Sequence, residues 1–356
     1  MEKREQLYNY YKSQFENIEI DANENIIKYS SAENEYNILK RGVGVRDLSN
    51  YSKIFIHGKD SESLLRRLTT NKIIDLKVLE WVKTLFINSE GNIIDKTLLM
   101  KFEDYFILIG ANRECGKLYK WIKRFIINDD IALSNSDYDY SVFEVMGNQA
   151  TSYMSMVLGE KFNELGNNNI LRVQIEDFFV HGVRVNDGNI DKYIVVVDAI
   201  NAVKTLKIMH DLKSVFDFGM IGEEAFNIYR IQKGIPISPN ELNDSVNPKE
   251  VFLNSEISSQ KHDYIGHENV KENNTDLGRL VKLEFDEAMI ENQLPITIYD
   301  EAKRKVGIVT SSTNSNVIDK QIGLGFVLAN HHLNGNSYFV MDSKSKVKVK
   351  ICELSK

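Results

Sequence analysis

The sequence is poor in cysteine, in basic charge and in long apolar runs, and each shortage excludes a class of protein. Only Cys115 and Cys352 occur among 356 residues, so neither a disulfide framework nor a paired-cysteine metal knuckle is available. The formal net charge of −7 argues against a broad nucleic-acid surface, because phosphate binding relies on clustered lysine and arginine. We therefore expect no nucleic-acid partner.

Long apolar segments are also missing. The longest aliphatic runs, such as residues 193–197, are far shorter than the roughly 20 residues of a membrane-spanning helix. The first residues, MEKREQLYNYYKSQ, carry charges where a secretory signal has an apolar centre. These features predict a folded cytoplasmic protein without membrane contact, and a hydrophobic content of 42% supplies side chains for real cores.

The length favours two or three domains. Up to residue 234, strand patterns alternate with helix patterns in two similar rounds, which is typical of α+β layers. After a polar segment at residues 236–260, the chain reads as short strands between turns, which predicts a small barrel or sandwich. The expected segments of the first round are a strand at 54–56 with a helix after it, a hairpin of 82–88 and 93–102, a strand at 105–111 and a helix within 113–126.

Several phrases, taken in order, resemble the glycine cleavage T-protein (aminomethyltransferase) superfamily. The resemblance spans nearly the whole chain and keeps the order and spacing of that family. Each phrase is weak alone, but together they are specific. The phrases are GVGVRDLSNYSKIFIHGKDSESLLRRLTTNKI, NSEGNIID, FEVMGNQA, NPKEVFLNSEISSQKHDYIGHE, GIVTSST and IGLGFV.

This resemblance implies an α+β fold: a three-domain ring of two ferredoxin-like α+β domains, discontinuous in sequence, and a C-terminal Greek-key β-barrel. The implied domains are residues 1–52 with 138–242, residues 53–137 with 243–276, and the barrel at 277–356. It further implies tetrahydrofolate as cofactor. In family enzymes a lipoyl-bound aminomethyl group is attacked by folate N5, ammonia leaves and methylenetetrahydrofolate forms.

The hairpin GNIIDKTLLM departs from the family at its chemical centre. Family enzymes carry two consecutive aspartates here, the second usually catalytic, where this chain has Asp95 and Lys96. Neighbours on a strand point to opposite faces, so Asp95 is not a simple substitute. A charged lysine neither accepts a proton nor favours a cationic amine beside it. We take Asp95 as the catalytic candidate, with a hairpin carboxylate bonded to turn amides as the alternative.

Three residues are candidates for binding the folate. Asn112 matches an asparagine that the family keeps, and Arg230 matches the arginine of the family's Arg-Leu-Glu-Ala-Gly helix. Lys96 is a candidate for folate's glutamate tail, with a solvated strand residue as the alternative. Arg230 has a structural alternative too, an ion pair with Glu223 or Glu241. Against the family pattern, Lys83 replaces a tyrosine, Ile109 replaces an asparagine, and the loop 185–189 lacks a glutamate.

Two further sets of residues have both a structural and a functional interpretation. Lysines and an arginine at 117–124 are interleaved with aromatics and fit either an acidic lipoyl carrier protein or a solvated helix face above inward-packed apolar residues. His262 and His267 are five residues apart, unlike the one-face spacing of a zinc-binding helix. We expect no metal site.

The leading hypothesis is a tetrahydrofolate-binding, T-protein-like transferase of one-carbon (aminomethyl) units, related to glycine cleavage. The alternative is a non-catalytic folate-binding scaffold or an iron–sulfur-cluster maintenance factor, because Lys96 occupies the usual aspartate position. Residues 261–268, KHDYIGHE, keep the tyrosine, glycine and glutamate of that factor's motif but lack its cysteine, whose thiolate is the reactive form.

Overall fold

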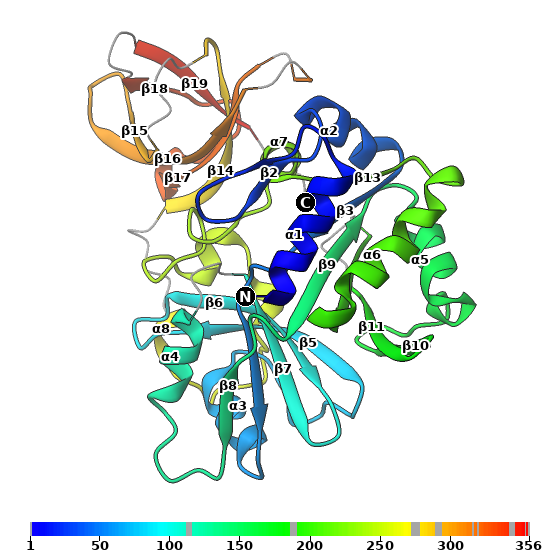
Figure 1. Ribbon diagram of the computed structural model, residues 1–356. Helices are drawn as coiled ribbons and strands as arrows, with labels where there is room; N and C mark the ends of the chain where they lie inside the picture. The colour runs from blue at the N-terminus through cyan, green and yellow to red at the C-terminus, as the bar shows by residue number, and fades with distance from the viewer. Residues whose placement is uncertain are drawn as a thin grey trace. The chain divides into compact units, whose positions relative to one another are not determined.

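Alternating apolar side chains build two open sheets, and a third group of strands closes into a barrel (Figure 1). The computed structural model describes residues 2–111, 116–185, 191–271, 278–288, 294–314, 317–318, 320–341, 346–352 and 354. The chain divides into two compact units. Unit 1 is Met1–Arg66, Ile73–Lys83 and Thr97–Phe226, and unit 2 is Arg67–Lys72, Thr84–Lys96 and Asn227–Lys356.

The six-stranded sheet has the order β10-β11-β12-β9-β3-β13. Its pairs are antiparallel except the outermost one, where β13 runs parallel to β3. Strands β10 and β11 form an antiparallel hairpin at one edge of this sheet. The strands are β3 Val43–Asp47, β9 Tyr140–Met146, β10 Ile170–Ile175, β11 Phe178–Arg184, β12 Lys192–Asp198 and β13 Phe218–Met220.

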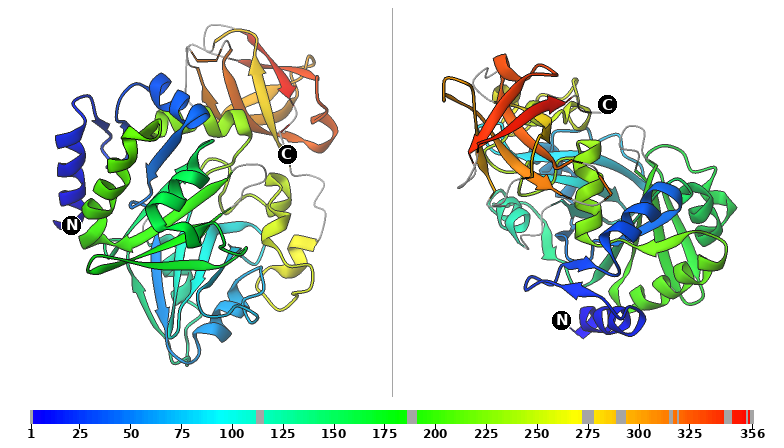
Figure 2. Two further views of the ribbon diagram at one scale, coloured as in Figure 1. Left: turned by 90° about the vertical axis from the view of Figure 1, so that its right-hand side faces the viewer. Right: turned by 90° about the horizontal axis from the view of Figure 1, so that it is seen from above.

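Helices cover one face of this sheet. Successive residues of a strand point to opposite faces. Phe143 and Val145 accordingly join the core beneath the helices, while Val142 between them joins a different core. Figures 1 and 2 show α5 and α6 lying along this sheet, with α1 beside α6. The helices and short turns of this region are α1 Glu2–Gln14, α2 Ala32–Arg41, α5 Ala150–Leu158, α6 Ala202–Asp211, η1 Glu160–Phe162, η2 Ala199–Asn201 and η3 Leu212–Ser214, with a small hairpin of β1 Glu19–Ile20 and β2 Ile26–Lys28.

The five-stranded sheet has the order β5-β6-β7-β4-β8. Within unit 1, Trp81, Phe102 and Ile107 of this sheet or its loops pack with Val142 and Val196 of the six-stranded sheet in one apolar cluster. The predicted hairpin and third strand are confirmed by β5, β6 and β7. The elements are β4 Lys53–His57, α3 Ser61–Leu68, β5 Glu80–Ile87, β6 Ile93–Lys101, β7 Tyr105–Gly110, α4 Lys117–Lys123 and β8 Ala132–Asn135.

The barrel belongs to unit 2 and closes in the order β14-β17-β16-β15-β18-β19. On β14, Val281, Leu283 and Phe285 fill its interior, whereas Leu280 packs outside with Leu242. The predicted C-terminal barrel is thus confirmed. Its strands are β14 Gly278–Phe285, β15 Ile296–Tyr299, β16 Lys305–Thr313, β17 Ile322–Leu328, β18 Ser337–Met341 and β19 Lys346–Cys352, with η6 Ala329–His331; before the barrel come α7 Glu223–Lys233, η4 Pro248–Val251, η5 Asn254–Glu256 and α8 His267–Lys271.

Within the described part of the chain, no helix is both long and apolar enough to cross a membrane. The longest, α1, has 13 residues and is rich in charged and polar side chains.

Candidate functional site

A tight turn positions the β6 residues that the sequence singles out. Gly91 has φ +82°, a left-handed conformation that glycine adopts without steric cost. Asn88 closes the turn, because its backbone N–H donates to the Asn92 carbonyl at 2.9 Å and its side-chain oxygen accepts from the Asn92 N–H at 2.8 Å. Strand β6 therefore begins at Ile93 in a fixed register.

Strand β6 separates Asp95 from Lys96. Asp95 is 3% exposed, whereas the Lys96 side chain is 24% exposed. Their different environments follow from the period of two along a strand, as the sequence predicts. The structure thus shows a buried carboxylate and a partly exposed ammonium that do not share a face.

Lys96 pairs with a carboxylate from a distant part of the chain. Its Nζ lies 3.6 Å from Oε1 of Glu256, whose side chain is nearly fully buried. Ser255 Oγ donates to Glu256 Oε2 at 2.6 Å. Thr70 Oγ1 donates to the Glu256 backbone carbonyl, also at 2.6 Å. The lysine charge is therefore balanced inside unit 2, a role that the sequence analysis missed.

Arg230 lies at the centre of a closed polar cluster in unit 2. Its side chain is 1% exposed. Nη1 is 3.2 Å from Glu241 Oε2, Nη2 donates to Ser311 Oγ at 2.8 Å, and Nε donates to Asn227 Oδ1 at 2.7 Å. Of the two ion-pair partners considered from sequence, Glu241 is correct. A folate contact by Arg230 stays a prediction.

Glu241 is held from several sides as well. Its Oε1 accepts from the hydroxyls of Thr310 and Ser311, each at 2.6 Å, and its Oε2 accepts from the Ile237 N–H at 3.1 Å. A buried ion pair is tolerable when further hydrogen bonds satisfy its remaining polar atoms. These bonds tie α7 and the segment after it to strand β16.

The other positions expected near folate are Asn112, the loop 185–189 and Ile109. Asn112 lies outside the described residues, as do residues 186–189 of the loop 185–189. Ile109 is buried in an apolar cluster with Trp81 and Met100, so the amide that the family carries at this position has no counterpart there.

The basic helix α4 has the amphipathic form that the sequence predicts. Leu118, Trp121 and Ile122 are buried, while Lys120 and Lys123 are exposed. The solvated-face interpretation accounts for these burial values. Docking of a carrier protein at α4 stays a prediction.

Two histidines meet although helical spacing does not bring them together. His262 Nδ1 is 2.9 Å from His267 Nε2, and His267 Nδ1 is 3.2 Å from Glu268 Oε1. His262 precedes α8 and lies in a loop, so a helical angle does not apply to the pair. Among the described residues, no group of three or more histidine, cysteine or acidic side chains is arranged to hold a metal ion.

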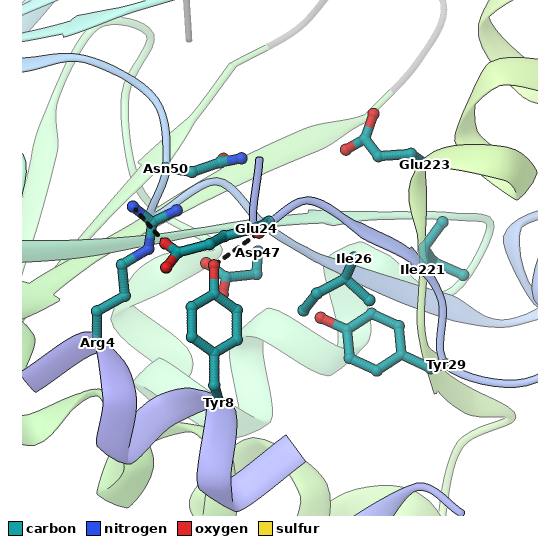
Figure 3. A pocket seen from close by; sticks show the side chains of 9 residues that line it. All are labelled: Arg4, Tyr8, Glu24, Ile26, Tyr29, Asp47, Asn50, Ile221 and Glu223. Carbon is teal, nitrogen blue, oxygen red and sulfur yellow. Dashed lines mark hydrogen bonds and ion pairs between the residues drawn. The ribbon is translucent and has the colours of Figure 1, made fainter. Parts of the chain in front are cut away.

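Unit 1 contains a pocket that the sequence analysis did not anticipate (Figure 3). Three carboxylates converge on it, and the Tyr8 hydroxyl on its rim donates to the Glu24 carbonyl at 2.7 Å. Burial raises the pKa of Tyr8 to about 12, so this phenol stays neutral near pH 7. The lining residues are Arg4, Tyr8, Glu24, Ile26, Tyr29, Asp47, Asn50, Ile221 and Glu223.

A buried arginine borders this pocket through Glu223. Arg46 Nη1 is 2.6 Å from Glu144 Oε2, Nη2 is 3.2 Å from Glu223 Oε1, and the guanidinium lies 3.2 Å from the centre of the Phe226 ring. Burial alone would raise the pKa of Glu144, but Lys192 and Arg46 lower it. The cluster is ionic and sits on strands β3 and β9.

Comparison with known proteins places these features in a family. Residues 7–261 match the GCVT N-terminal domain, and residues 279–355 match the glycine cleavage T-protein C-terminal barrel domain. The fold of two open sheets followed by a closed barrel is that of this class of proteins. The chain belongs to the glycine cleavage T-protein family, as its sequence motifs indicate.

Individual relatives agree with this assignment. The chain is 26% identical over 340 residues to an aminomethyltransferase of Oceanobacillus iheyensis, covering 91% of this chain and 90% of that one. It is also 26% identical over 348 residues to an aminomethyltransferase of Staphylococcus carnosus, with the same coverage. The crystal structure of glycine cleavage system aminomethyltransferase T from Bartonella henselae matches with a TM-score of 0.78 at 16% identity, covering 91% of this chain and 89% of that chain. This last likeness concerns the fold alone.

Proposed function

We propose that this protein binds tetrahydrofolate and transfers a one-carbon unit of the aminomethyl type, with Asp95 as the carboxylate that holds the reacting amine. The observation that carries the proposal is the separation on β6. Asp95 is buried, while the charge of Lys96 is balanced by Glu256 at 3.6 Å. The substitution at the usual aspartate position therefore leaves the buried carboxylate of Asp95 in the strand, on the face opposite to Lys96.

Asp95 has the chemistry that the reaction needs from the protein. A buried carboxylate accepts hydrogen bonds from an amine, favours its charged form and can take up its proton. Tetrahydrofolate, when bound, supplies the nitrogen nucleophile that receives the one-carbon unit. The aminomethyl donor in this proposal is a lipoyl carrier protein. The relatives named aminomethyltransferase support the aminomethyl group as the unit that is transferred.

A second candidate is a folate-binding scaffold that does not catalyse transfer. Ile109 favours it, because this side chain is packed among apolar residues where the family has an amide. Arg230 favours it too, since Glu241, Ser311 and Asn227 already bind its guanidinium. Both observations leave fewer polar groups for a folate than the family pattern supplies.

The test is a calorimetric titration with tetrahydrofolate and 5-formyltetrahydrofolate, followed by an assay of ammonia released from an aminomethyl-loaded carrier protein. Asp95→Asn keeps the shape of the side chain and removes its charge. We expect it to retain folding and to lose about 100-fold or more in transfer rate, as is usual when a general acid or base is removed. The matched control is Asp104→Asn, because Asp104 is an exposed acid beside β7.

The outcomes separate the two candidates. Folate binding with ammonia release that falls in Asp95→Asn and not in Asp104→Asn supports the transferase. Binding without ammonia release in the wild type supports the scaffold. If neither folate gives heat or competes with the other, both candidates are wrong.

A further inference from the structure

Two buried polar atoms at the pocket of unit 1, Tyr29 Oη and Asn50 Oδ1, make no hydrogen bond of normal geometry to the described residues. The Tyr11 hydroxyl is a polar neighbour of Tyr29 Oη. Tyr29 is 3% exposed, and Figure 3 shows its hydroxyl directed toward the other lining side chains. Leaving a buried polar atom unsatisfied costs free energy, so such atoms at one pocket indicate a missing hydrogen-bonding ligand.

The orientation of Asn50 is fixed by a chain of amides. Asn25 Nδ2 donates to Asp21 Oδ2 at 2.8 Å, and this leaves the Asn25 oxygen to accept from Asn50 Nδ2 at 2.6 Å. The Asn50 oxygen is consequently the free end of its side chain. It is an acceptor only, and a ligand that meets it must donate a hydrogen.

Negatively charged side chains outnumber positively charged ones at the pocket. Its lining holds the carboxylates of Glu24, Asp47 and Glu223, but only one cationic side chain, Arg4. Arg4 lies 3.6 Å from the exposed Glu24, and the 25% exposed Glu223 pairs with Arg46 outside the lining. Asp47 accepts hydrogen bonds from the Tyr11 hydroxyl at 3.0 Å and from the Ser49 N–H at 2.7 Å.

The pocket also limits the size of what it takes. The free space accommodates a group about as large as one water molecule, with Ile26 and Ile221 as apolar walls. The tyrosine rings of the lining add π faces that attract cations. Burial keeps the Tyr29 phenol neutral by raising its pKa well above the ordinary value near 10, so its oxygen is able to accept as well as donate.

We propose that this pocket binds an ammonium group, either the free ion or the end of a small primary amine. An ammonium group donates three or four hydrogen bonds and accepts none, which matches Asn50 Oδ1, the Asp47 carboxylate and the Tyr29 oxygen. The proposal is independent of folate binding, because it rests on residues of unit 1 that the proposed transfer step does not use.

The test measures the melting temperature of the full chain in chlorides of ammonium, methylammonium, potassium and tetramethylammonium at one ionic strength. A ligand that binds only the folded state stabilises it in proportion to the logarithm of its concentration over Kd. We expect stabilisation by ammonium, methylammonium or both, and a smaller effect of potassium and tetramethylammonium. Stabilisation by ammonium alone identifies the free ion, and a tighter response to methylammonium identifies a primary amine.

Two substitutions each remove one hydrogen-bond acceptor from the pocket. Tyr29→Phe keeps the ring, and Asn50→Leu keeps the approximate size of the side chain. Each is expected to weaken ammonium binding by about 3- to 10-fold, the usual effect of one hydrogen bond. Tyr10→Phe is the control, since Tyr10 packs on Tyr11 but does not line the pocket. Near-UV circular dichroism checks the fold of each variant.

A direct measurement avoids reliance on the variants. Line broadening of ¹⁵N-ammonium by the wild-type protein, reversed by excess methylammonium, supports the proposal. An equal response to potassium would mean that hydrogen-bond donation is not required, and the proposal would then fail. It would also fail if all four salts had the same effect, because water alone then fills the pocket.

Discussion

Two buried arginines, Arg46 in unit 1 and Arg230 in unit 2, have similar partners but different surroundings. Arg230 is enclosed, and its carboxylate partner Glu241 has no exposed side-chain surface. Arg46 stacks on Phe226 and reaches the partly exposed Glu223, which lines a pocket. The difference lies in the carboxylate partner of each arginine: protein side chains enclose Glu241, whereas Glu223 lines a pocket.

The largest effect is expected for Arg230→Met. This change leaves Glu241 as a buried charge without its cation, and breaking a buried pair in this way costs about 3–5 kcal/mol in the free energy of unfolding. Urea unfolding followed by far-UV circular dichroism measures it. A loss below about 1 kcal/mol, as for exposed pairs, would mean that the cluster does not carry the stability we assign to it.

Arg46→Met is expected to cost less, about 1–3 kcal/mol. Glu144 keeps a second cation, because Lys192 Nζ remains 3.1 Å from its Oε1. Both tryptophans, Trp81 and Trp121, belong to unit 1, so tryptophan fluorescence follows the unit in which Arg46 lies. Adding Lys192→Met should raise the loss to that of Arg230→Met. If the double variant is no worse than the single one, the compensation by Lys192 is not real.

The two units should also differ in the pH dependence of their stability. Burial, helped by the nearby Arg172, lowers the pKa of His181 in unit 1 from 6.5 to about 4. The unfolded chain therefore binds the proton first as pH falls, and stability is lost from pH 6.5 down to about 4. In unit 2, burial raises the pKa of Glu250 from 4.5 to about 7. Between pH 4.5 and about 7 the folded protein keeps the proton on Glu250 while the unfolded chain releases it. The free energy of unfolding therefore falls as pH rises through this range.

The variants His181→Gln and Glu250→Gln isolate these contributions. The difference in unfolding free energy between wild type and His181→Gln should increase with pH across its window. The corresponding difference for Glu250→Gln should decrease. Urea titrations at half-unit pH steps give both curves. Slopes of equal sign would contradict the assignment.

The smallest effect is expected for Lys96→Gln. The pair with Glu256 is longer than a direct hydrogen bond, and Lys96 is partly exposed, so its loss should cost at most about 1 kcal/mol. Denaturation at low and high salt measures the cost and its screening. A loss as large as that of Arg230→Met would show that Lys96 and Glu256 form a buried pair in solution.

Sequence patterns were sufficient for elements whose apolar residues repeat locally. The hairpin of β5 and β6 and the barrel strands follow from short apolar segments bounded by turn residues, because such a pattern is visible within each segment. Strand β13 was not predicted. It has three residues and exists because it pairs in parallel with β3, about 175 positions earlier in the chain.

The candidate site was predictable only in part, for the same reason. Opposite faces for Asp95 and Lys96 follow from strand geometry, and Glu241 was one of two partners considered for Arg230. No sequence pattern identifies Glu256 as the partner of Lys96, because the two residues come close together only when the chain folds. The unit 1 pocket is likewise assembled from α1, β2, β3 and the start of α7.

The chain passes back and forth between the two units, and this has a consequence for synthesis. Residues 84–96 belong to unit 2, and apart from residues 67–72 the rest of that unit comes after residue 226. Leu85, Ile87 and Ile93 pack against side chains such as Leu280 and Leu324. A ribosome adding roughly 5–20 residues per second needs on the order of 10–50 seconds to reach those partners. For that time a nascent hairpin displays apolar side chains with no core to enter, which makes it a natural point of action for chaperones.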